Sequence, residues 1–391
     1  MSHDSVTFAF FLIFSGAAVL ASLALYTRQP LIIAYVALGA LIGPYGLALV
    51  TDLKLLADIG HIGIIFLLFL LGLDMQPQAL IATIRKSTFV GLASSGAFFL
   101  VSWFAAAAFF GASTDAVLIA VAMMFSSTII GIKLLPTTVL HHRHIGEMMI
   151  GLLLLQDVLA IIALVVITAL ASPGTKSATV QISQVLIALP LLGLASAALV
   201  KFLILPLIRR FDRFHEYIFL LAIGWCLGVA ETAQLLGLSA EIGAFVAGVS
   251  IATSPISQYI AVNLKPLRDF FLILFFFAVG ARFDLAKLPE IWIPALSIAA
   301  LVLAMKPVIY RYLLKGVSEK RTLAWDLGFR LGQASEFSLL IAYVALDAAL
   351  VSTTASLVIQ ATTIITLILS SYIVVLNYPT PIAIHDRLRR D

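Results

Sequence analysis

The chain has 391 residues, of which 62% are hydrophobic and 11% are charged, and a formal net charge of +4. Soluble domains contain roughly 45–50% apolar and about 25% charged residues, so this composition excludes a soluble fold. Lys and Arg lie almost entirely between the apolar stretches, where membrane topology accounts for them, and we infer no nucleic-acid partner. The single cysteine, Cys226, excludes a disulfide framework and a cysteine-rich metal site.

Apolar stretches long enough to cross a bilayer core, which takes about 20 residues in a helix, recur along the whole chain. We expect about thirteen spans, at residues 6–26, 31–50, 58–73, 88–111, 115–136, 146–171, 181–207, 217–237, 239–254, 266–282, 291–314, 324–347 and 353–377. The residues before the first span lack the basic start and cleavage site of a secretory signal, so we expect this span to be retained. The predicted fold is therefore an all-α polytopic membrane protein.

Residues 1–391 are expected to form a single transmembrane domain. No GxGxxG motif follows a strand and opens a helix, so we expect no soluble nucleotide-binding domain in this chain. The loop charges predict its orientation, because Lys and Arg are retained on the cytoplasmic side of a membrane. With the C-terminus in the cytoplasm, the loop cations that fall outside are Lys54, Lys176, Arg282 and Lys287. We therefore expect an odd number of spans in the inner (plasma) membrane, with the N-terminus outside.

The carboxylate that stands out inside an expected span is Asp157. Asp157 occurs in the apolar sequence GLLLLQDVLAII, directly after Gln156. An ionisable side chain in the middle of a membrane is costly unless it is paired or hydrated, so it is a functional hypothesis by default. Here the hypothesis is a site for a cation and a proton, and the alternative is a structural hydrogen-bond partner buried between helices.

Small and polar residues interrupt two other expected spans. In the earlier span they are Ser126, Ser127 and Thr128, and in the later one they are Gly332, Gln333, Ser335 and Glu336. Hydroxyl groups can bond back to their own helix and merely bend it, but these clusters predict locally unwound helices. Unwound backbone is tolerated in a membrane only where it lines a cavity or is buried in protein.

Lys306 precedes Pro307 inside a further span. Proline removes a backbone hydrogen bond, so we expect a break or kink there, with the lysine either capping the freed carbonyl groups or serving the site. Counted at about 1.5 Å per residue, Asp157, Lys306, Ser127 and Glu336 lie within roughly 6 Å of one another along the membrane normal. The two interrupted spans would run in opposite directions, as in inverted repeats whose discontinuous helices meet at a midplane site.

Other polar residues have simpler interpretations. Asp326 and Arg330 are four apart on one helix and are expected to pair, although Arg330 could also reach toward the site. Glu231 and Glu241 are expected to cap helix ends or to hydrogen-bond locally. The histidines at 141, 142 and 144 are expected to lie in a solvated loop rather than to bind a metal.

At these residues the chain resembles the monovalent cation:proton antiporter superfamily, and specifically the transmembrane domain of Kef-type potassium efflux proteins. The motifs that carry the resemblance are, in order, AYVALGALIGPYGL, IGIIFLLFLLGLDM, SST at 126–128, the Gln156–Asp157 dipeptide, GLSAEIGAFVAGV, FFFAVGARFDL and GQASEF. Each motif is a loose pattern, but their joint order along nearly the whole chain is specific. The segment 254–270 departs from the family, because it lacks a clear match to the acidic regulatory loop of glutathione-gated members.

The resemblance implies an inverted-repeat fold, in which a scaffold bundle that dimerises is interleaved along the chain with a core that carries two crossed, discontinuous helices. It also implies that Asp157 is the ion-binding carboxylate and that Lys306 faces it. The implied partners are membrane lipid, a second copy of the chain, and a separate regulatory nucleotide-binding domain or subunit.

We therefore expect a secondary active transporter rather than an enzyme, exchanging K⁺ in preference to Na⁺ for H⁺ by alternating access, without a cofactor. The expected cation and proton site consists of Asp157, Gln156, Ser127 and Thr128. The expected accessory residues are Lys306, Glu336, Ser126, Gln333 and Arg330. A cation channel and a sodium-coupled transporter of an organic anion remain open as alternatives, and the residues do not fix the stoichiometry.

Overall fold

A computed structural model describes residues 6–27, 29–74, 77–133, 144–171, 178–211, 213–252, 254, 256–316 and 320–380. These segments are almost entirely helical. The chain divides into two compact units, the first made of Met1–Leu49, Ile81–Leu164 and Val279–Asp391 and the second of Val50–Leu80 and Val165–Ala278. Each unit is built from segments that are distant in sequence, so neither could be recognised as a continuous domain.

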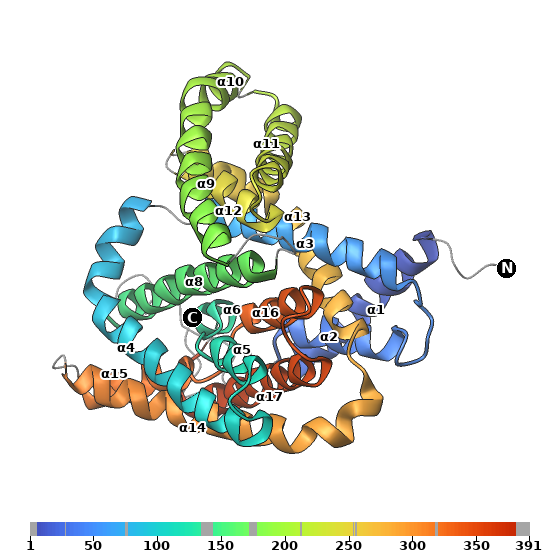
Figure 1. The fold of residues 1–391 in the computed structure, drawn as a ribbon, viewed down its shortest axis with the longest axis vertical. Helices are drawn as coiled ribbons and strands as arrows, with labels where there is room; N and C mark the ends of the chain where they lie inside the picture. Colours follow the sequence, from blue (N-terminus) through green and yellow to red (C-terminus); the bar gives the residue numbers. More distant parts are fainter. Residues whose placement is uncertain are drawn as a thin grey trace. The chain divides into compact units, whose positions relative to one another are not determined.

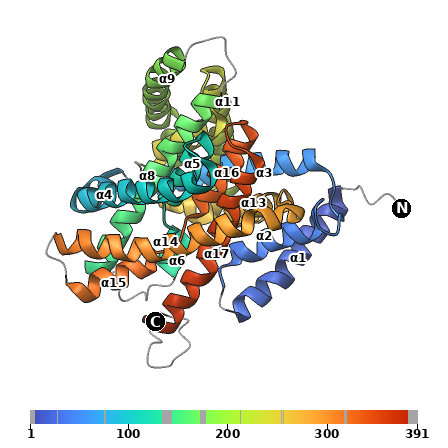
Figure 2. The same ribbon diagram turned by 60° about the horizontal axis from the view of Figure 1, so that its bottom comes forward.

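The first unit contains most of the helices in Figure 1. They are α1 (Val6–Tyr26), α2 (Leu31–Ile42), α4 (Pro77–Phe110), α5 (Thr114–Met123), α6 (Thr128–Lys133), α8 (His144–Ala171), the short 3₁₀ helix η2 (Leu285–Lys287), α14 (Leu288–Gly316), α15 (Arg321–Arg330), α16 (Glu336–Asp347) and α17 (Thr353–Asn377). Helix α14 packs against α15 and α17, and α5 packs against α16 and α17, as Figures 1 and 2 show. This unit therefore contains the two places where a pair of short helices, α5 with α6 and α15 with α16, replaces one long helix.

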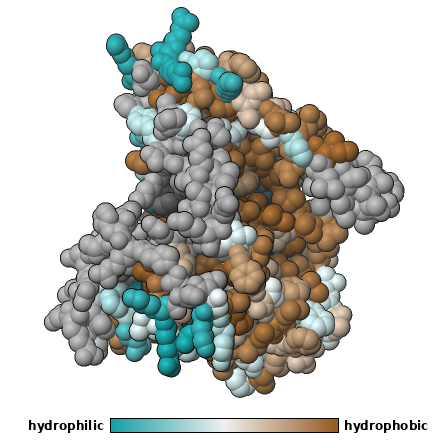
Figure 3. All heavy atoms as spheres, turned by 90° about the vertical axis from the view of Figure 1, so that its left-hand side faces the viewer, coloured by the Kyte–Doolittle hydropathy of each residue, from teal (hydrophilic) through white to brown (hydrophobic). Residues whose placement is uncertain are grey.

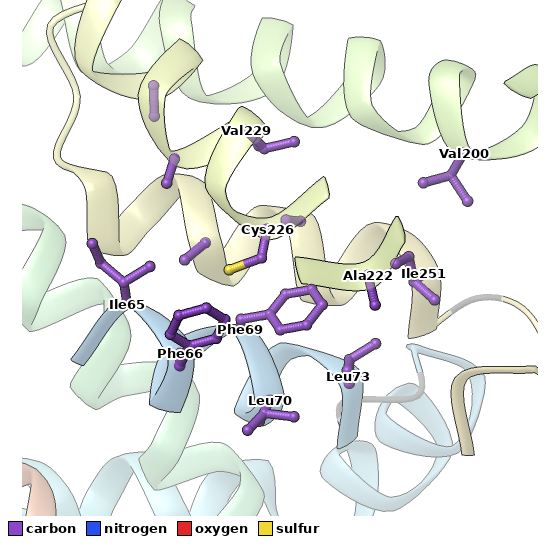
Figure 4. Packing of buried hydrophobic residues seen from close by; sticks show 14 of the residues in the cluster. Ile65, Phe66, Phe69, Leu70, Leu73, Val200, Ala222, Cys226, Val229 and Ile251 are labelled. Atoms are coloured by element: carbon purple, nitrogen blue, oxygen red, sulfur yellow. The ribbon is translucent and has the colours of Figure 1, made fainter. Parts of the chain in front are cut away.

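The second unit consists of α3 (Leu53–Asp74), α9 (Ala178–Leu199), the π-helical turn η1 (Val200–Ile204), α10 (Leu205–Arg210), α11 (His215–Leu235), α12 (Ala240–Ala252) and most of α13 (Ile256–Ala281). Helix α12 packs against α3, α9 and α11. In its core, Cys226 of α11 lies beside Phe66 and Phe69 of α3 (Figure 4). Glycines bring α3 and α12 into backbone contact, since a Cβ at Gly248 would collide with the carbonyl oxygen of Phe69.

The surface fits a lipid environment. Seven described helices are long and apolar enough to cross a membrane, and five shorter described helices are also apolar. Large apolar side chains are exposed on several of them, including Val19, Leu194, Phe202 and Leu220. Brown, apolar residues cover much of the described part of the face drawn in Figure 3. The all-α, multi-pass membrane fold expected from the sequence is therefore confirmed.

The expected spans at 6–26 and 353–377 coincide with α1 and α17. The expected span at 31–50 is too long, because α2 ends at Ile42 and is followed by turns. Gly43 precedes Pro44, a position that disfavours helix, and its ψ of −178° is extended. The expected count of about thirteen spans stays a prediction.

Proline acts differently at two other positions. Before Pro206, the end of α9 widens into η1, because proline supplies no N–H to the carbonyl four residues earlier and the hydrogen-bond pattern shifts. In contrast, α14 runs uninterrupted through Pro307, so of the break or kink expected there the break is wrong and the kink stays a prediction. Gly328 of α15 lies directly against this proline, where a Cβ would approach Pro307 Cα to 2.8 Å. Close packing with a neighbouring helix is the setting in which membrane helices tolerate proline.

Candidate cation site at two helix breaks

Both predicted interruptions are present in the first unit. Helix α5 ends at Met123 and α6 begins at Thr128, and between them residues 125–127 have no regular structure. Helix α15 ends at Arg330 and α16 begins at Glu336. We call residues 124–127 the first break and residues 331–335 the second break.

Serine side chains explain where the helices resume. Ser127 Oγ accepts a hydrogen bond from the N–H of Ile130 at 3.2 Å, which caps the start of α6. Ser335 accepts one from the N–H of Phe337 at 3.2 Å, while Ser338 Oγ accepts one from the N–H of Ser335 at 3.3 Å. This reciprocal pair is a capping box at the start of α16. The serines that predicted the breaks therefore also terminate them.

The two breaks are bonded to each other. Ser126 Oγ donates to the carbonyl oxygen of Leu331 at 2.8 Å, and Ser338 Oγ donates to that of Ala122 at 2.5 Å. All four residues are buried. Segments more than 200 positions apart in sequence thus form one polar junction inside an apolar bundle.

Lys306 lies at this junction and is wholly buried. Its Nζ donates to the carbonyl oxygens of Phe125 at 2.7 Å and Gln333 at 2.8 Å, and to Ser126 Oγ at 3.3 Å. The ammonium group also lies 5.2 Å from the centre of the Phe98 ring. Lys306 therefore caps freed carbonyls, as one reading of the sequence expected, but they belong to the two breaks rather than to its own helix.

Asp157 lies on α8 with only 2% of its surface exposed. Thr128 Oγ1 lies 3.1 Å from each of its two carboxylate oxygens. Among the described residues no ion pair joins Asp157 to Lys306, and Glu336 is the first residue of α16, directly after the second break. The carboxylate thus faces the start of α6 without a bonded cationic side chain.

Gln156 uses both ends of its amide to hold the first break. Its Oε1 accepts from the N–H of Ser126 at 2.9 Å, and its Nε2 donates to the hydroxyl of Tyr310 at 3.0 Å. The sequence predicted Gln156 as an ion ligand, whereas here its oxygen is engaged by the backbone. Tyr310 was missed, although its position four residues after Lys306 places both on one face of α14.

Helix α17 holds the second break. Ser370 Oγ donates to Gln333 Oε1 at 2.8 Å, and the N–H of Ala334 donates to Thr366 Oγ1 at 3.1 Å. Gln333 Nε2 in turn reaches the carbonyl oxygen of Ser127 at 3.5 Å, so the accessory role expected of it corresponds to bridging the breaks. Thr366 and Ser370 were missed in the sequence, where two hydroxyls four apart in an apolar span were the available signal.

Arg330 makes the expected pair with Asp326, with 2.6 Å between Nε and Oδ1. It also donates to the carbonyl oxygen of Pro379 at 2.8 Å and lies over the Tyr378 ring. Burial and the Asp326 carboxylate raise the pKa of Tyr378, an effect that Arg330 partly offsets. These contacts tie the end of α15 to the segment that follows α17.

The remaining polar residues lie elsewhere. Glu231 is exposed, and Glu241 pairs with Nδ1 of His61 at 3.3 Å in the second unit. Of the histidines predicted to lie in a loop, those at 141 and 142 lie outside the described residues, whereas His144 is the first residue of α8. Within the described segments no group of three or more His, Cys, Asp and Glu residues could hold a metal ion. The candidate site for a hard monovalent cation is therefore the oxygen-rich junction beside Asp157.

Comparison with known proteins supplies the family. Residues 10–376 match the family model described as "Sodium/hydrogen exchanger, transmembrane". K(+) efflux antiporter 6 of Arabidopsis thaliana is 26% identical over 352 residues, which cover 87% of this chain and 58% of that protein. The glutathione-regulated potassium-efflux system protein KefC of Klebsiella pneumoniae is 30% identical over 351 residues, which cover 86% of this chain and 55% of that protein.

The fold has a solved counterpart. The structure of the sodium proton antiporter MjNhaP1 from Methanocaldococcus jannaschii superposes with a TM-score of 0.71 at 17% identity, covering 94% of this chain and 96% of that one. The chain spans slightly more than half the length of the curated relatives it matches. By its match along residues 10–376, the chain belongs to the sodium/hydrogen exchanger family.

Proposed function

We propose that the chain is a secondary active antiporter that exchanges a monovalent cation, K⁺ in preference to Na⁺, for protons. The observation that carries the proposal is the buried Asp157 carboxylate, bonded by Thr128 where α6 begins and lacking a bonded cationic side chain among the described residues. Family membership supports cation:proton exchange. The names of the efflux relatives support K⁺ as the cation.

The proposed mechanism is competition for one carboxylate. Deprotonated Asp157 binds a dehydrated cation together with the Thr128 hydroxyl and backbone oxygens of the first break. Protonation removes the charge, weakens the ion's coordination and releases it. If the bundle that carries Asp157 changes access only when the carboxylate is neutralised, the result is obligatory exchange by alternating access.

The geometry refines the expected ligand set. Gln156 and Lys306 position the backbone, because their polar atoms are engaged by the breaks. Asp157, Thr128 and Ser127 stay as proposed cation ligands, although the Ser127 carbonyl oxygen also accepts hydrogen bonds from the N–H of Gly131 and from Gln333 Nε2. Glu336, which begins α16 directly after the second break, is proposed as an accessory carboxylate.

A dimer is part of the proposal and rests on the family resemblance. Movement of a core against a fixed partner needs an anchored scaffold, which a second copy of the chain provides. Native mass spectrometry in several mild detergents tests this point. A monomeric mass throughout would contradict it.

Vesicles containing the purified protein and an internal pH dye provide the functional test. Addition of K⁺, Na⁺, Li⁺ or Rb⁺ is expected to drive proton movement in the parent protein and none in Asp157→Asn, which keeps the shape but cannot alternate its charge. Asp58→Asn is the matched control, because Asp58 is exposed. Thermal unfolding of each purified variant shows that loss of exchange is not loss of fold.

The same assay separates the competing functions. Cation flux that persists without proton movement identifies a channel, and dependence on an added organic anion identifies a sodium-coupled anion transporter. A folded Asp157→Asn variant that exchanges at the parent rate would overturn the proposed mechanism.

A further inference from the structure

Tyr310 is wholly buried, and the mechanism proposed above assigns it no role. Its hydroxyl accepts a hydrogen bond from Gln156 Nε2 at 3.0 Å, and Gln156 Oε1 accepts one from the N–H of Ser126 at 2.9 Å. Ser126 lies two residues before Thr128, which bonds Asp157. The tyrosine is thus connected to the candidate cation site through two hydrogen bonds and a short stretch of the first break.

From this geometry we infer that Tyr310 is a positioning residue that determines the cation selectivity of the Asp157 site by orienting Gln156. The inference rests on the proposed exchange at Asp157. It goes further by assigning selectivity to a residue that does not touch the ion.

The tyrosine hydroxyl determines which way the Gln156 amide points. An amide offers an acceptor at one end and two donors at the other, so an acceptor placed at Nε2 directs Oε1 toward the N–H of Ser126. Without the hydroxyl, Nε2 loses that acceptor and the amide is free to rotate. The buried N–H of Ser126 then has no acceptor, which is energetically costly. We therefore expect the backbone of the first break to shift until this N–H finds another acceptor.

The Tyr310 ring is itself held in place. It packs edge-on against Phe98, with ring centres 5.3 Å apart and planes at 77°. The same Phe98 ring lies under the Lys306 ammonium group. Phe98, Lys306 and Tyr310 therefore form one packed group that reaches the first break in two ways, through Lys306 and through the Tyr310 hydroxyl, which bonds Gln156 and also interacts with the Ser126 side chain.

Ser126 receives both connections. Its N–H is bonded by Gln156, and its hydroxyl bonds Leu331 and Lys306. K⁺ and Na⁺ are bound by the same kinds of oxygen atom, and discrimination between them depends on cavity size and on the number of ligands. A first break held at several atoms presents its oxygens at fixed separations, whereas a loosened break adapts to ions of different radius.

The test compares Tyr310→Phe, which removes only the hydroxyl, with Tyr312→Phe. Tyr312 lies on the same helix and is 71% exposed, so its hydroxyl cannot act on the site. In vesicles, the half-maximal concentrations of K⁺, Na⁺, Rb⁺ and Li⁺ for proton movement are measured for both variants. The ratio between the best and worst cation is expected to narrow by about two- to tenfold in Tyr310→Phe, the range of one hydrogen bond's net contribution, and to stay at the parent value in Tyr312→Phe.

Gln156→Met provides the second arm, because methionine has a similar shape and offers no amide. It is expected to narrow the selectivity ratio as Tyr310→Phe does, and Tyr310→Phe added to it is expected to change the ratio by clearly less than it does in the parent protein, because most of its effect passes through Gln156. If Tyr310→Phe fails to fold, parent selectivity in Gln156→Met still overturns the inference. Parent selectivity in either folded single variant, or fully additive changes in the double variant, would overturn the inference.

Asp157→Asn in the same vesicles separates this inference from the proposed function. Exchange that survives in Asp157→Asn refutes the proposed function. Exchange that is lost there, with parent selectivity retained in Tyr310→Phe, refutes only the role of Tyr310.

Discussion

Lys306 Nζ donates a hydrogen bond to the backbone oxygen of Gln333 at 2.8 Å, although the two residues are 27 positions apart, one in α14 and the other after the end of α15. The same ammonium group bonds the carbonyl of Phe125 at 2.7 Å, 181 positions away in sequence. Both carbonyls follow helix ends, where backbone oxygens lack a partner within the helix. One side chain therefore satisfies acceptors from both breaks.

Replacing Lys306 is expected to lower stability according to how many donors remain. Lys306→Met leaves two buried acceptors without this donor, at about 1–3 kcal/mol each, so its thermal midpoint should fall clearly. Lys306→Gln keeps two amide N–H donors, so its thermal midpoint should fall less. This variant should also retain some exchange, with an altered dependence on pH or membrane potential. Thermal unfolding and vesicle transport measure the two effects.

Lys315→Gln is the control for this comparison, because Lys315 lies at the exposed end of the same helix. Equal losses of stability in Lys306→Met and Lys306→Gln, with an unchanged transport profile in the latter, would contradict the capping role.

Cations and protons are expected to compete at Asp157. At a pH well below the pKa of the carboxylate, each further unit of acidity should weaken apparent cation binding about tenfold, which corresponds to roughly 1.4 kcal/mol. The cation concentration that half-protects the protein against thermal unfolding, measured across a pH series, reports this slope. Binding that does not depend on pH over the whole stable range would indicate separate sites.

Thr128 is expected to contribute to cation affinity through its hydroxyl, which lies 3.1 Å from both oxygens of Asp157. Thr128→Val keeps the shape but removes the hydroxyl, and it should raise the half-maximal cation concentration about two- to tenfold. Thr128→Ser keeps the hydroxyl and should stay close to the parent. Similar cation affinities in the Thr128→Val and Thr128→Ser variants would show that the Thr128 hydroxyl does not bind the cation.

The close approach of α3 and α12 in the second unit predicts a strong effect of Gly248→Ala. The new methyl group would collide with the Phe69 carbonyl and lie within 2.9 Å of Gly72 Cα, so the helices must separate. Overpacking of this kind costs about 1–3 kcal/mol and should lower the thermal midpoint.

Gly224→Ala serves as its control, because a Cβ there meets nothing within 4 Å and alanine favours helix. A thermal midpoint for Gly248→Ala that equals that of Gly224→Ala would show that α3 and α12 are not in this contact.

The sequence predicted features that depend on local composition. Ser126 to Thr128 and Gly332 to Ser335 mark the two breaks because small and polar residues at membrane depth have few other uses. It also located α1 and α17, whose apolar stretches end at clear polar boundaries.

Features that depend on contacts with a distant part of the chain were not predictable in the same way. The effect of Pro307 depends on Gly328 packing against it from another helix, and the target of Lys306 depends on carbonyls supplied by two breaks. Tyr310 looks in sequence like any aromatic residue of an apolar helix. Only the fold brings it to Gln156, 154 positions earlier.

The position of Lys306 has a further consequence for the proposed exchange cycle. Helix C-termini leave backbone carbonyl groups without a partner in the helix, and Lys306 donates hydrogen bonds to carbonyl oxygens just beyond the ends of α5 and α15. A transported ion is therefore not needed to hold these helix ends together. Without a bound cation, the polar junction between the two breaks can keep its structure. A cation can therefore leave and be replaced without the junction having to refold.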